Sequence, residues 1–371
     1  MRGGWVRESI ANVLDVKPNL KGSEIAAILG WHKKEINSFL AQNIDVYIRD
    51  DANFTWSNKD PLNVKEIKID FPSGWVDANT YENEVLAGHD FFINKGRVSF
   101  IFKKNTKLLM EVIARFISLI NQLNDYGIKV VIDLENCTAS HGYLNRAGFF
   151  ELTNTGIIIL PKRPSHSTAQ QFKGNCRSLV EFGEICPKSE NKQLKNDLRT
   201  SFITQTSSEY ANVATLFFAE FIGNVSDHSE SKLKGFAGLQ LYSPPNSKKH
   251  IQAVISDSGR GVVATLRTTL KHNYPDLYKK YPEDQEEADI GLALEVFSKG
   301  QITRFGKSSG RGLGFKSTTD NASRFDANLS IRLNDFSIQL IYRKGKLISE
   351  DIHKNLTYIH GTHICFDFII D

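Results

Sequence analysis

Three short stretches in the second half of the chain bring acidic, amide, histidine and glycine residues together at regular spacing. They begin at Glu220, Asp257 and Gly310 and read EFIGNVSDH, DSGRG and GRGLG. In the first, apolar residues recur at helical spacing from about 210 to 228, which predicts a helix. Glu220, Asn224 and either Asp227 or His228 recur every three or four residues, so they share one face of that helix. An amide oxygen can bind Mg²⁺ directly and a carboxylate can orient a water molecule, so this face could hold a metal ion.

The second and third stretches have the composition of a nucleotide site. A strand is predicted over 250–256, which places Asp257 at its end, where a carboxylate can accept a hydrogen bond from an exocyclic amine such as that of adenine. Gly259 and Gly261 leave the backbone open to a flat ring. The third stretch leads into a helix predicted over 313–323. Backbone N–H groups of a glycine-rich turn at a helix start bind anions, here a triphosphate.

Each stretch also has an ordinary interpretation. An acid and an amide on an amphipathic helix usually form its solvated face, Asp-Ser-Gly after a strand is usually a turn, and a glycine-rich segment is usually a loop. The joint occurrence of the three, in this order and on these expected elements, favours one shared pocket.

The same stretches resemble the motifs of the GHKL (Bergerat-fold) ATPases, the family of gyrase-type topoisomerases, sensor histidine kinases and anti-sigma-factor serine kinases. The N box of that family reads E-x-x-x-N, its G1 box D-x-G-x-G and its G2 box G-x-G-L-G, and a late Gly-Thr precedes the last strand, here Gly361 and Thr362. The resemblance covers about 188–371 and implies a C-terminal α/β sandwich that binds ATP and Mg²⁺. By resemblance, Glu220 activates water, Asn224 binds Mg²⁺ and Asp257 binds adenine.

The full set of expected ATP contacts is larger. It consists of Asn224, Asp227, His228, Asp257, Gly259, Gly261, Lys307, Gly310, Arg311, Gly312, Leu313, Gly314 and Thr362. Lys307 and Arg311 flank the phosphate turn and could offset γ-phosphate charge, although both could equally be ordinary exposed basic residues. The charged segment 262–309, between the second and third stretches, corresponds to the nucleotide lid of the family and is expected to be a mobile gate.

The elements that must position these residues are predicted as follows. Strands are expected over 179–185, 236–242, 250–256, 327–333, 336–342 and 361–370, with a helix over 189–204 before the helix that carries Glu220. The helix over 189–204 contains no His, which argues against autophosphorylation of the histidine-kinase type. A domain boundary is placed near 166.

The first 60 residues predict three helices and a small hairpin. Ser23 is a plausible N-cap of the second helix and Gly30 its end, and the third helix is expected over 33–42. The hairpin is expected to pair 45–47 with 54–56. This plan looks like a winged helix–turn–helix, in which Lys33, Lys34 and Asn37 would contact duplex DNA. Because the segment holds eight basic and eight acidic residues, docking to a protein partner stays an equal alternative.

Residues 61–165 predict a second, α/β domain with a linker at its start. Strands are expected over 66–71, 97–102, 128–134 and 156–160, with helices over 107–126 and 142–150. Alternation of strands and helices implies a parallel sheet. The run after Asp133 loosely resembles the STAS domains, the partners of anti-sigma-factor kinases, in which a Ser or Thr at a helix start is phosphorylated. Thr138 or Ser140 would hold that place; alternatively Ser140 only caps a helix.

Composition sets broad limits. The net charge is +4, which by itself does not argue for nucleic acid, and the four cysteines form no C-x-x-C pair, which argues against a zinc site. No signal peptide or membrane span is evident, so a cytoplasmic protein is expected.

The α/β (α+β) chain is therefore expected to be a Mg²⁺-dependent ATP-binding switch with slow hydrolysis, divided into domains 1–60, 61–165 and 166–371. The alternatives are a serine/threonine kinase of the anti-sigma-factor type and a non-catalytic, nucleotide-sensing DNA-binding regulator. By resemblance the protein could dimerise, and roles in bacterial defence and in transcription control both fit.

Overall fold

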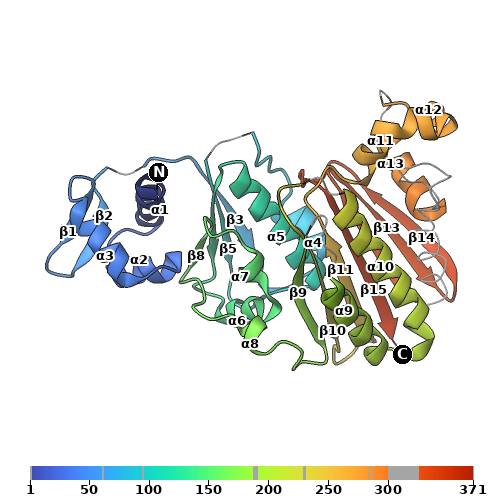
Figure 1. Ribbon diagram of the computed structural model, residues 1–371, viewed down its shortest axis with the longest axis horizontal. Helices are drawn as coiled ribbons and strands as arrows, with labels where there is room; N and C mark the ends of the chain where they lie inside the picture. The colour runs from blue at the N-terminus through green and yellow to red at the C-terminus, as the bar shows by residue number, and fades with distance from the viewer. Residues whose placement is uncertain are drawn as a thin grey trace. The chain divides into compact units, whose positions relative to one another are not determined.

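The chain folds into two compact units of mixed α/β structure. The computed structural model describes residues 2–60, 62–93, 96–186, 191–228, 231–283, 285, 287–299 and 326–370. The N-terminal unit contains Met1–Val76, Asp90–Leu108 and Leu123–Gln171, and the C-terminal unit contains Asp77–His89, Leu109–Gln122 and Phe172–Asp371 (Figure 1). The division differs from the three expected domains. The first two share one unit, and two short segments from the middle of the chain belong to the C-terminal unit.

The N-terminal unit has a four-stranded parallel sheet, as the alternation of strands and helices predicts. Its order is β3-β5-β7-β8, with β3 Glu66–Phe71, β5 Arg97–Phe102, β7 Lys129–Asp133 and β8 Ile158–Leu160. The remaining elements of this part are β4 Gly74–Val76, β6 Thr106–Leu108, α6 Thr138–Ala147, α7 Phe149–Leu152 and α8 Thr168–Gln171. The helix expected from residue 107 begins at Met110, because Thr106–Leu108 instead pairs in parallel with β4.

Three helices and a hairpin precede this sheet. They are α1 Arg2–Val16, α2 Gly22–Leu29, α3 Lys33–Gln42, β1 Tyr47–Asp50 and β2 Thr55–Asn58. The expectation that Ser23 caps α2 is wrong: Lys21 is the N-cap, and its N–H donates to Glu24 Oε2 at 2.7 Å. Gly30 ends the helix at φ 70°, as predicted. The hairpin pairs Tyr47–Asp50 with Thr55–Asn58, so its strands lie about two residues later than expected.

These helices share a hydrophobic core with the parallel sheet. Leu14, Ile25 and Leu40 pack in one buried cluster with Val131 and Ile158 of the sheet. The first 60 residues therefore do not form an isolated domain core.

The C-terminal unit is built on a seven-stranded antiparallel sheet (Figure 1). Its order is β14-β13-β12-β15-β11-β10-β9, with β9 Leu179–Ile185, β10 Gly235–Tyr242, β11 Lys249–Ser256, β12 Ala327–Leu333, β13 Phe336–Arg343, β14 Lys346–His353 and β15 Thr362–Ile370. Every strand expected in this unit is present within one or two residues. Strand β14 was not predicted, because its sequence KLISEDIH forms a largely exposed edge without an apolar face.

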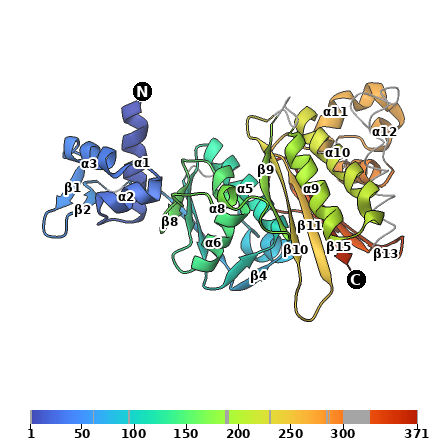
Figure 2. The same ribbon diagram turned by 60° about the horizontal axis from the view of Figure 1, so that its bottom comes forward.

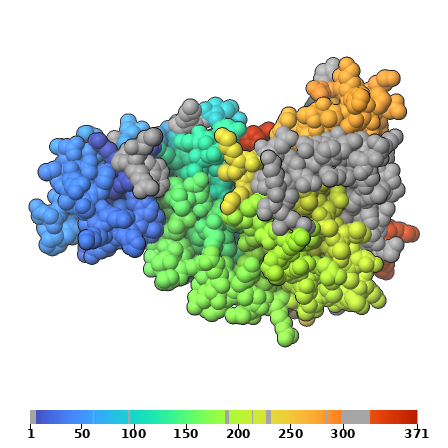
Figure 3. All heavy atoms as spheres, in the orientation of Figure 1, coloured from blue at the N-terminus to red at the C-terminus, as the bar shows by residue number. Residues whose placement is uncertain are grey.

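Side chains alternate between the two faces of this sheet. Ile251, Ala253 and Ile255 of β11 face a buried apolar core, as do Ile364, Phe366 and Phe368 of β15. Helices α9 Lys192–Gln205 and α10 Ala211–His228 cover this apolar face (Figure 2). Their outer sides form part of the surface seen in Figure 3, in yellow-green.

The segment expected to be a mobile lid contains helices. They are α11 Val262–Asn273, α12 Pro275–Lys280, α13 Ala288–Leu294 and the π-helix Glu295–Lys299. Val263, Leu266 and Leu270 of α11 are buried in the core, as are Leu292 and Ala293 of α13. That this segment acts as a gate over 262–309 stays a prediction; residues 300–309 lie outside the described part of the chain.

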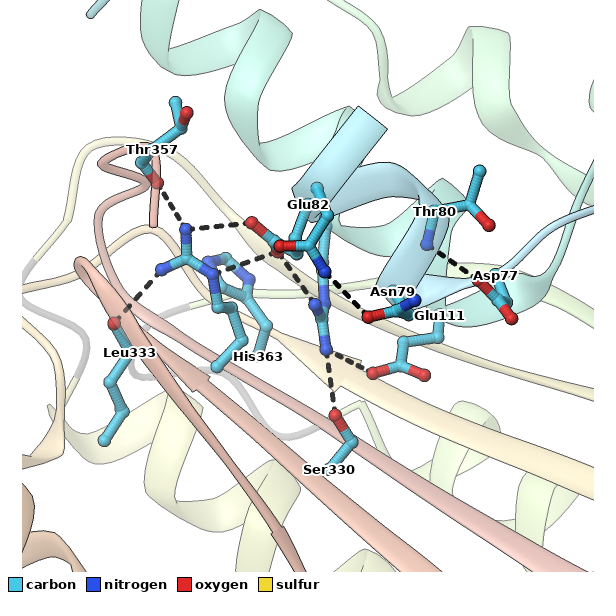
Figure 4. Close-up of polar contacts among 12 residues, drawn as sticks. Asp77, Asn79, Thr80, Glu82, Glu111, Ser330, Leu333, Thr357 and His363 are labelled. Atoms are coloured by element: carbon cyan, nitrogen blue, oxygen red, sulfur yellow. Dashed lines mark hydrogen bonds and ion pairs between the residues drawn. The ribbon is translucent and has the colours of Figure 1, made fainter. Parts of the chain in front are cut away.

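The opposite, polar face of the sheet is also buried within the C-terminal unit. It is covered by α4 Ala78–Thr80, the π-helix Tyr81–Val85 and the first part of α5 Met110–Asp125. Figure 4 shows the polar contacts on this face. The side chain of Glu82 accepts hydrogen bonds from Arg115 Nη1 at 2.8 Å and from Arg332 Nε at 3.0 Å. Arg115 also donates to Ser330 Oγ at 2.9 Å and pairs with Glu111.

Within the described part of the chain, no helix is both long and apolar enough to cross a bilayer.

Candidate functional site

Helix α10 places Glu220 and Asn224 one turn apart on the same side. Buried aromatic residues of the same helix, Phe217, Phe218 and Phe221, fix it on the apolar face of the sheet. The Asn224 amide nitrogen donates to Glu220 Oε1 at 3.3 Å. This bond leaves the amide oxygen on the other side of the group, where it can bind a cation. Burial raises the pKa of Glu220, opposed by the hydrogen bond from Asn224.

Asp257 occupies the first position after strand β11 and is almost fully buried. By the alternation of the strand it follows Ile255 on the side of α10. Its Oδ1 accepts a hydrogen bond from the Gly259 N–H at 2.7 Å. Burial raises the pKa of Asp257 to about 6, although the hydrogen bonds from backbone N–H groups favour the ionised form. A buried carboxylate at a strand end is suited to accept a hydrogen bond from a ligand amine.

The start of β15 closes against this turn. The Asp257 N–H donates to Thr362 O at 3.0 Å, and the Val262 N–H donates to Thr362 Oγ1 at 3.1 Å. Gly261 has φ +82° and Gly361 has φ +105°, values that favour glycine. Thr362 therefore meets the turn from Asp257 to Gly261, about 100 residues earlier in the sequence, at one end of the sheet.

Gly235 shows that helix α10 reaches this end of the sheet. A Cβ built on Gly235 would lie 2.3 Å from Val225 Cγ1 and 3.7 Å from Asp257 Cβ. Val225 follows Asn224 directly in α10. The first and second sequence motifs therefore lie side by side, as a shared site requires.

No family model, curated protein or solved structure matches this chain. The candidate site therefore depends on the geometry of its residues and on the motifs in the sequence.

The remaining expected ATP contacts are only partly described. Asp227 and His228 belong to the last turn of α10, but their side chains are not described. The expected phosphate turn, with Gly310, Arg311, Gly312, Leu313 and Gly314, lies outside the described residues. So do Lys307 and the helix predicted over 313–323.

The residues present fit a metal bound together with a ligand. Within the described ranges, no three or more His, Cys, Asp and Glu side chains gather to hold an ion. Mg²⁺ commonly takes one or two protein oxygen ligands and completes its shell with water and phosphate oxygens. The Asn224 amide oxygen, beside the Glu220 carboxylate, could provide these one or two protein ligands.

Other expected site residues lie in the N-terminal unit. Lys33, Lys34 and Asn37 are exposed on α3, so they are available to a partner. Thr138 is the exposed first residue of α6. Ser140 is buried and donates to the Thr106 carbonyl. Ser140 is thus neither an accessible phosphoacceptor nor the N-cap of α6, which is Cys137.

A group of polar residues behind the candidate site was not predicted from the sequence. Gln122 of α5 and the segments around Ser258 and His360 contact one another on the polar face. Arg115 and Arg332 are almost fully buried there. A signal was present, because Arg115 interrupts an apolar helix and Arg332 lies within an apolar strand.

Proposed function

We propose that the C-terminal unit binds Mg²⁺-ATP between the end of α10 and the Asp257 turn, and hydrolyses it slowly as a GHKL-type switch. The observation that carries the proposal is the contact at Gly235, where Val225 of the E-x-x-x-N helix and Asp257 of D-x-G-x-G both lie within 4 Å of one point. Residues of the two motifs are separated by more than 25 positions in the sequence. Their proximity supports a common ligand.

The architecture supports the proposal independently of the motifs. A Bergerat fold is an α/β sandwich, and here α9 and α10 form a helical layer on one face of an antiparallel sheet (Figure 2). The Gly361-Thr362 pair closes against Asp257, at the end of the sheet where Val225 of α10 lies close to Asp257. The proposal requires the ATP contacts to lie at this end of the sheet.

Each described residue has a chemical role in this proposal. Asp257 accepts a hydrogen bond from the adenine amine. The amide oxygen of Asn224 is a ligand for Mg²⁺, which neutralises phosphate charge when bound. Glu220 has a raised pKa, and a carboxylate with a raised pKa is a better proton acceptor for an attacking water molecule.

The N-terminal unit is proposed to be the module that the nucleotide controls. Its three helices and hairpin fit a winged helix, and its parallel sheet has an exposed Thr138 at the helix start after β7, the place expected for a STAS-like phosphoacceptor. Exposed Lys33 and Lys34 on α3 fit DNA or an acidic protein partner. Duplex DNA binding that weakens steeply with salt would support the first partner.

A direct binding measurement tests the proposed function. Titration calorimetry with ATP and ADP, with and without Mg²⁺, should show one site per chain. Asp257→Asn should weaken both nucleotides, and Asn224→Ala should remove the dependence on Mg²⁺. Glu184→Gln, which changes a surface ion pair of the same unit, is the control. Wild-type protein without affinity for either nucleotide would refute the proposal.

Labelled ATP separates hydrolysis from the alternatives. With γ-labelled ATP, free phosphate supports the ATPase and label on protein supports a serine/threonine kinase. Nucleotide binding with neither product supports a sensor that only changes conformation.

A further inference from the structure

Gln122 holds together the two backbone segments that meet at Asp257. Its side chain lies on the polar face of the sheet and is only 2% exposed. The amide oxygen accepts a hydrogen bond from the His360 N–H at 2.9 Å. The amide nitrogen donates to His360 O at 2.9 Å and to Ser258 Oγ at 3.0 Å. Both backbone groups of His360 are therefore paired with one side chain, as a neighbouring strand would pair them.

The two partners of Gln122 flank a close backbone contact of the candidate site. Ser258 follows Asp257 directly, and His360 directly precedes Gly361. A Cβ on Gly361 would lie 2.0 Å from Asp257 O, so no side chain fits between these segments. Gln122 thus fixes the Asp257 turn from the face opposite to α10.

Only a side chain of this length with both a donor and an acceptor can make the three bonds. Glutamate lacks the donor, and asparagine is one methylene shorter. One turn earlier on α5, Ser118 Oγ lies 3.2 Å from Ser256 Oγ, at the last position of β11. The same side of α5 therefore contacts the chain on both sides of Asp257.

We propose that Gln122 is a positioning residue for adenine recognition: it holds the Asp257 carboxylate where it accepts the hydrogen bond from the adenine amine. This inference rests on the proposed ATP site. It predicts that replacing Gln122 lowers the preference of the site for adenine over other bases. A purely structural role would only lower the amount of folded protein.

The experiment compares ATP with ITP, whose base carries a carbonyl oxygen in place of the exocyclic amine. Wild-type protein should bind ATP more tightly than ITP, because a carboxylate repels a carbonyl oxygen. Gln122→Met keeps the length of the side chain and removes its polar atoms. We expect this variant to lose about tenfold in ATP affinity, about the value of one or two hydrogen bonds, while ITP affinity changes little.

Gln252→Met is the matched control. Gln252 is also a buried glutamine on the polar face, but it lies earlier in β11 and bonds with Glu111 and Asp367. We expect its replacement to leave the ratio of ATP to ITP affinity unchanged. If each of the two variants lowers the affinities for ATP and ITP by the same factor, Gln122 has only a structural role and the inference is overturned.

A milder variant keeps the test decisive if Gln122→Met does not fold. Ser258→Ala removes one of the three bonds and should lower the ratio of ATP to ITP affinity by a smaller factor; an unchanged ratio would contradict the inference. Wild-type protein that binds neither nucleotide would overturn the proposed function itself. Wild-type protein that prefers ATP, with variants that keep this preference, would overturn the role of Gln122 alone.

Discussion

Gly361 packs so closely on Asp257 that a Cβ on Gly361 would lie 2.0 Å from the Asp257 carbonyl oxygen. The glycine also has φ +105°, which side chains rarely adopt. Gly361→Ala must therefore displace the backbone of the Asp257 turn. We expect a loss of at least about 2–3 kcal/mol in the free energy of unfolding, measured by urea denaturation, together with weaker nucleotide binding.

Gly88→Ala separates the two causes of that loss. Gly88 has φ +76° in the same unit, but nothing lies within 4 Å of its added Cβ. Its replacement should cost only about 1–2 kcal/mol, the cost of the left-handed conformation. Equal losses for the two variants would show that the contact with Asp257 is unimportant.

The charge of Asp257 should destabilise the free protein at neutral pH. Its pKa is about 6 in the folded chain, against an ordinary value of 3.8, and burial is the largest cause. A raised carboxyl pKa gives stability that is present below about pH 4 and is lost as the pH rises through 6, at most about 3 kcal/mol. Asp257→Asn should therefore unfold at higher urea concentration than wild type at pH 8, with the difference shrinking towards pH 4. A constant difference across this range would contradict the assignment.

The same ionisation should control nucleotide affinity in the opposite direction. The ionised carboxylate of Asp257 is a stronger acceptor for the adenine amine than the protonated group, so ATP affinity should fall as the pH drops below 6. The ATP phosphates titrate in the same way when ATP binds wild type or Asp257→Asn. The ratio of wild-type to variant affinity therefore isolates the titration of the Asp257 carboxyl group. A ratio that stays flat between pH 5 and pH 8 would exclude Asp257 as the adenine acceptor.

The buried cluster on the polar face predicts a large loss of stability for one substitution. Glu82 is the shared partner of Arg115 and Arg332, which are 2% and 0% exposed (Figure 4). Glu82→Gln leaves two buried guanidinium groups with less negative charge. The expected loss is about 3–5 kcal/mol in the free energy of unfolding.

A surface ion pair in the same unit is the control for that loss. Lys234 lies 2.6 Å from Glu184, and both side chains are largely exposed. Glu184→Gln should cost less than about 1 kcal/mol, because solvent screens the pair. A loss of similar size for Glu82→Gln would mean that the buried cluster contributes little.

Much of the strand and helix content could be predicted, because it depends on local periodicity. Strands β3, β5, β9 and β12 have the predicted bounds, and α10 begins one residue from its expected start. The proximity of Val225 in α10 to Asp257 could be inferred only from motif order, because no local pattern encodes which segments meet. Helices α11 and α13 were not predicted as helices with buried faces, because their charged residues obscured the buried positions.

The polar face of the sheet could not be predicted from alternation. Polar residues such as Gln252, Ser330 and His363 at every second strand position normally indicate a solvated face. Here α5 and residues 77–89 cover that face, and Gln252, Ser330 and His363 each form a hydrogen bond with a residue distant in the sequence. Such a pairing depends on contacts between segments more than 100 residues apart, which residue periodicity does not reveal.

Glu220 should be needed for hydrolysis but not for binding. Gln at this position keeps the size of the side chain and can still bond with Asn224, but it cannot accept a proton from water. We expect Glu220→Gln to keep ATP affinity within about threefold and to lower the rate of phosphate release by about 100-fold or more, the usual contribution of a general base. Glu209→Gln, which removes an exposed carboxylate just before α10, should leave both values unchanged. Because burial raises the pKa of Glu220, the wild-type rate should also fall as the pH drops through that raised value. Hydrolysis by Glu220→Gln at the wild-type rate would show that another group activates the water.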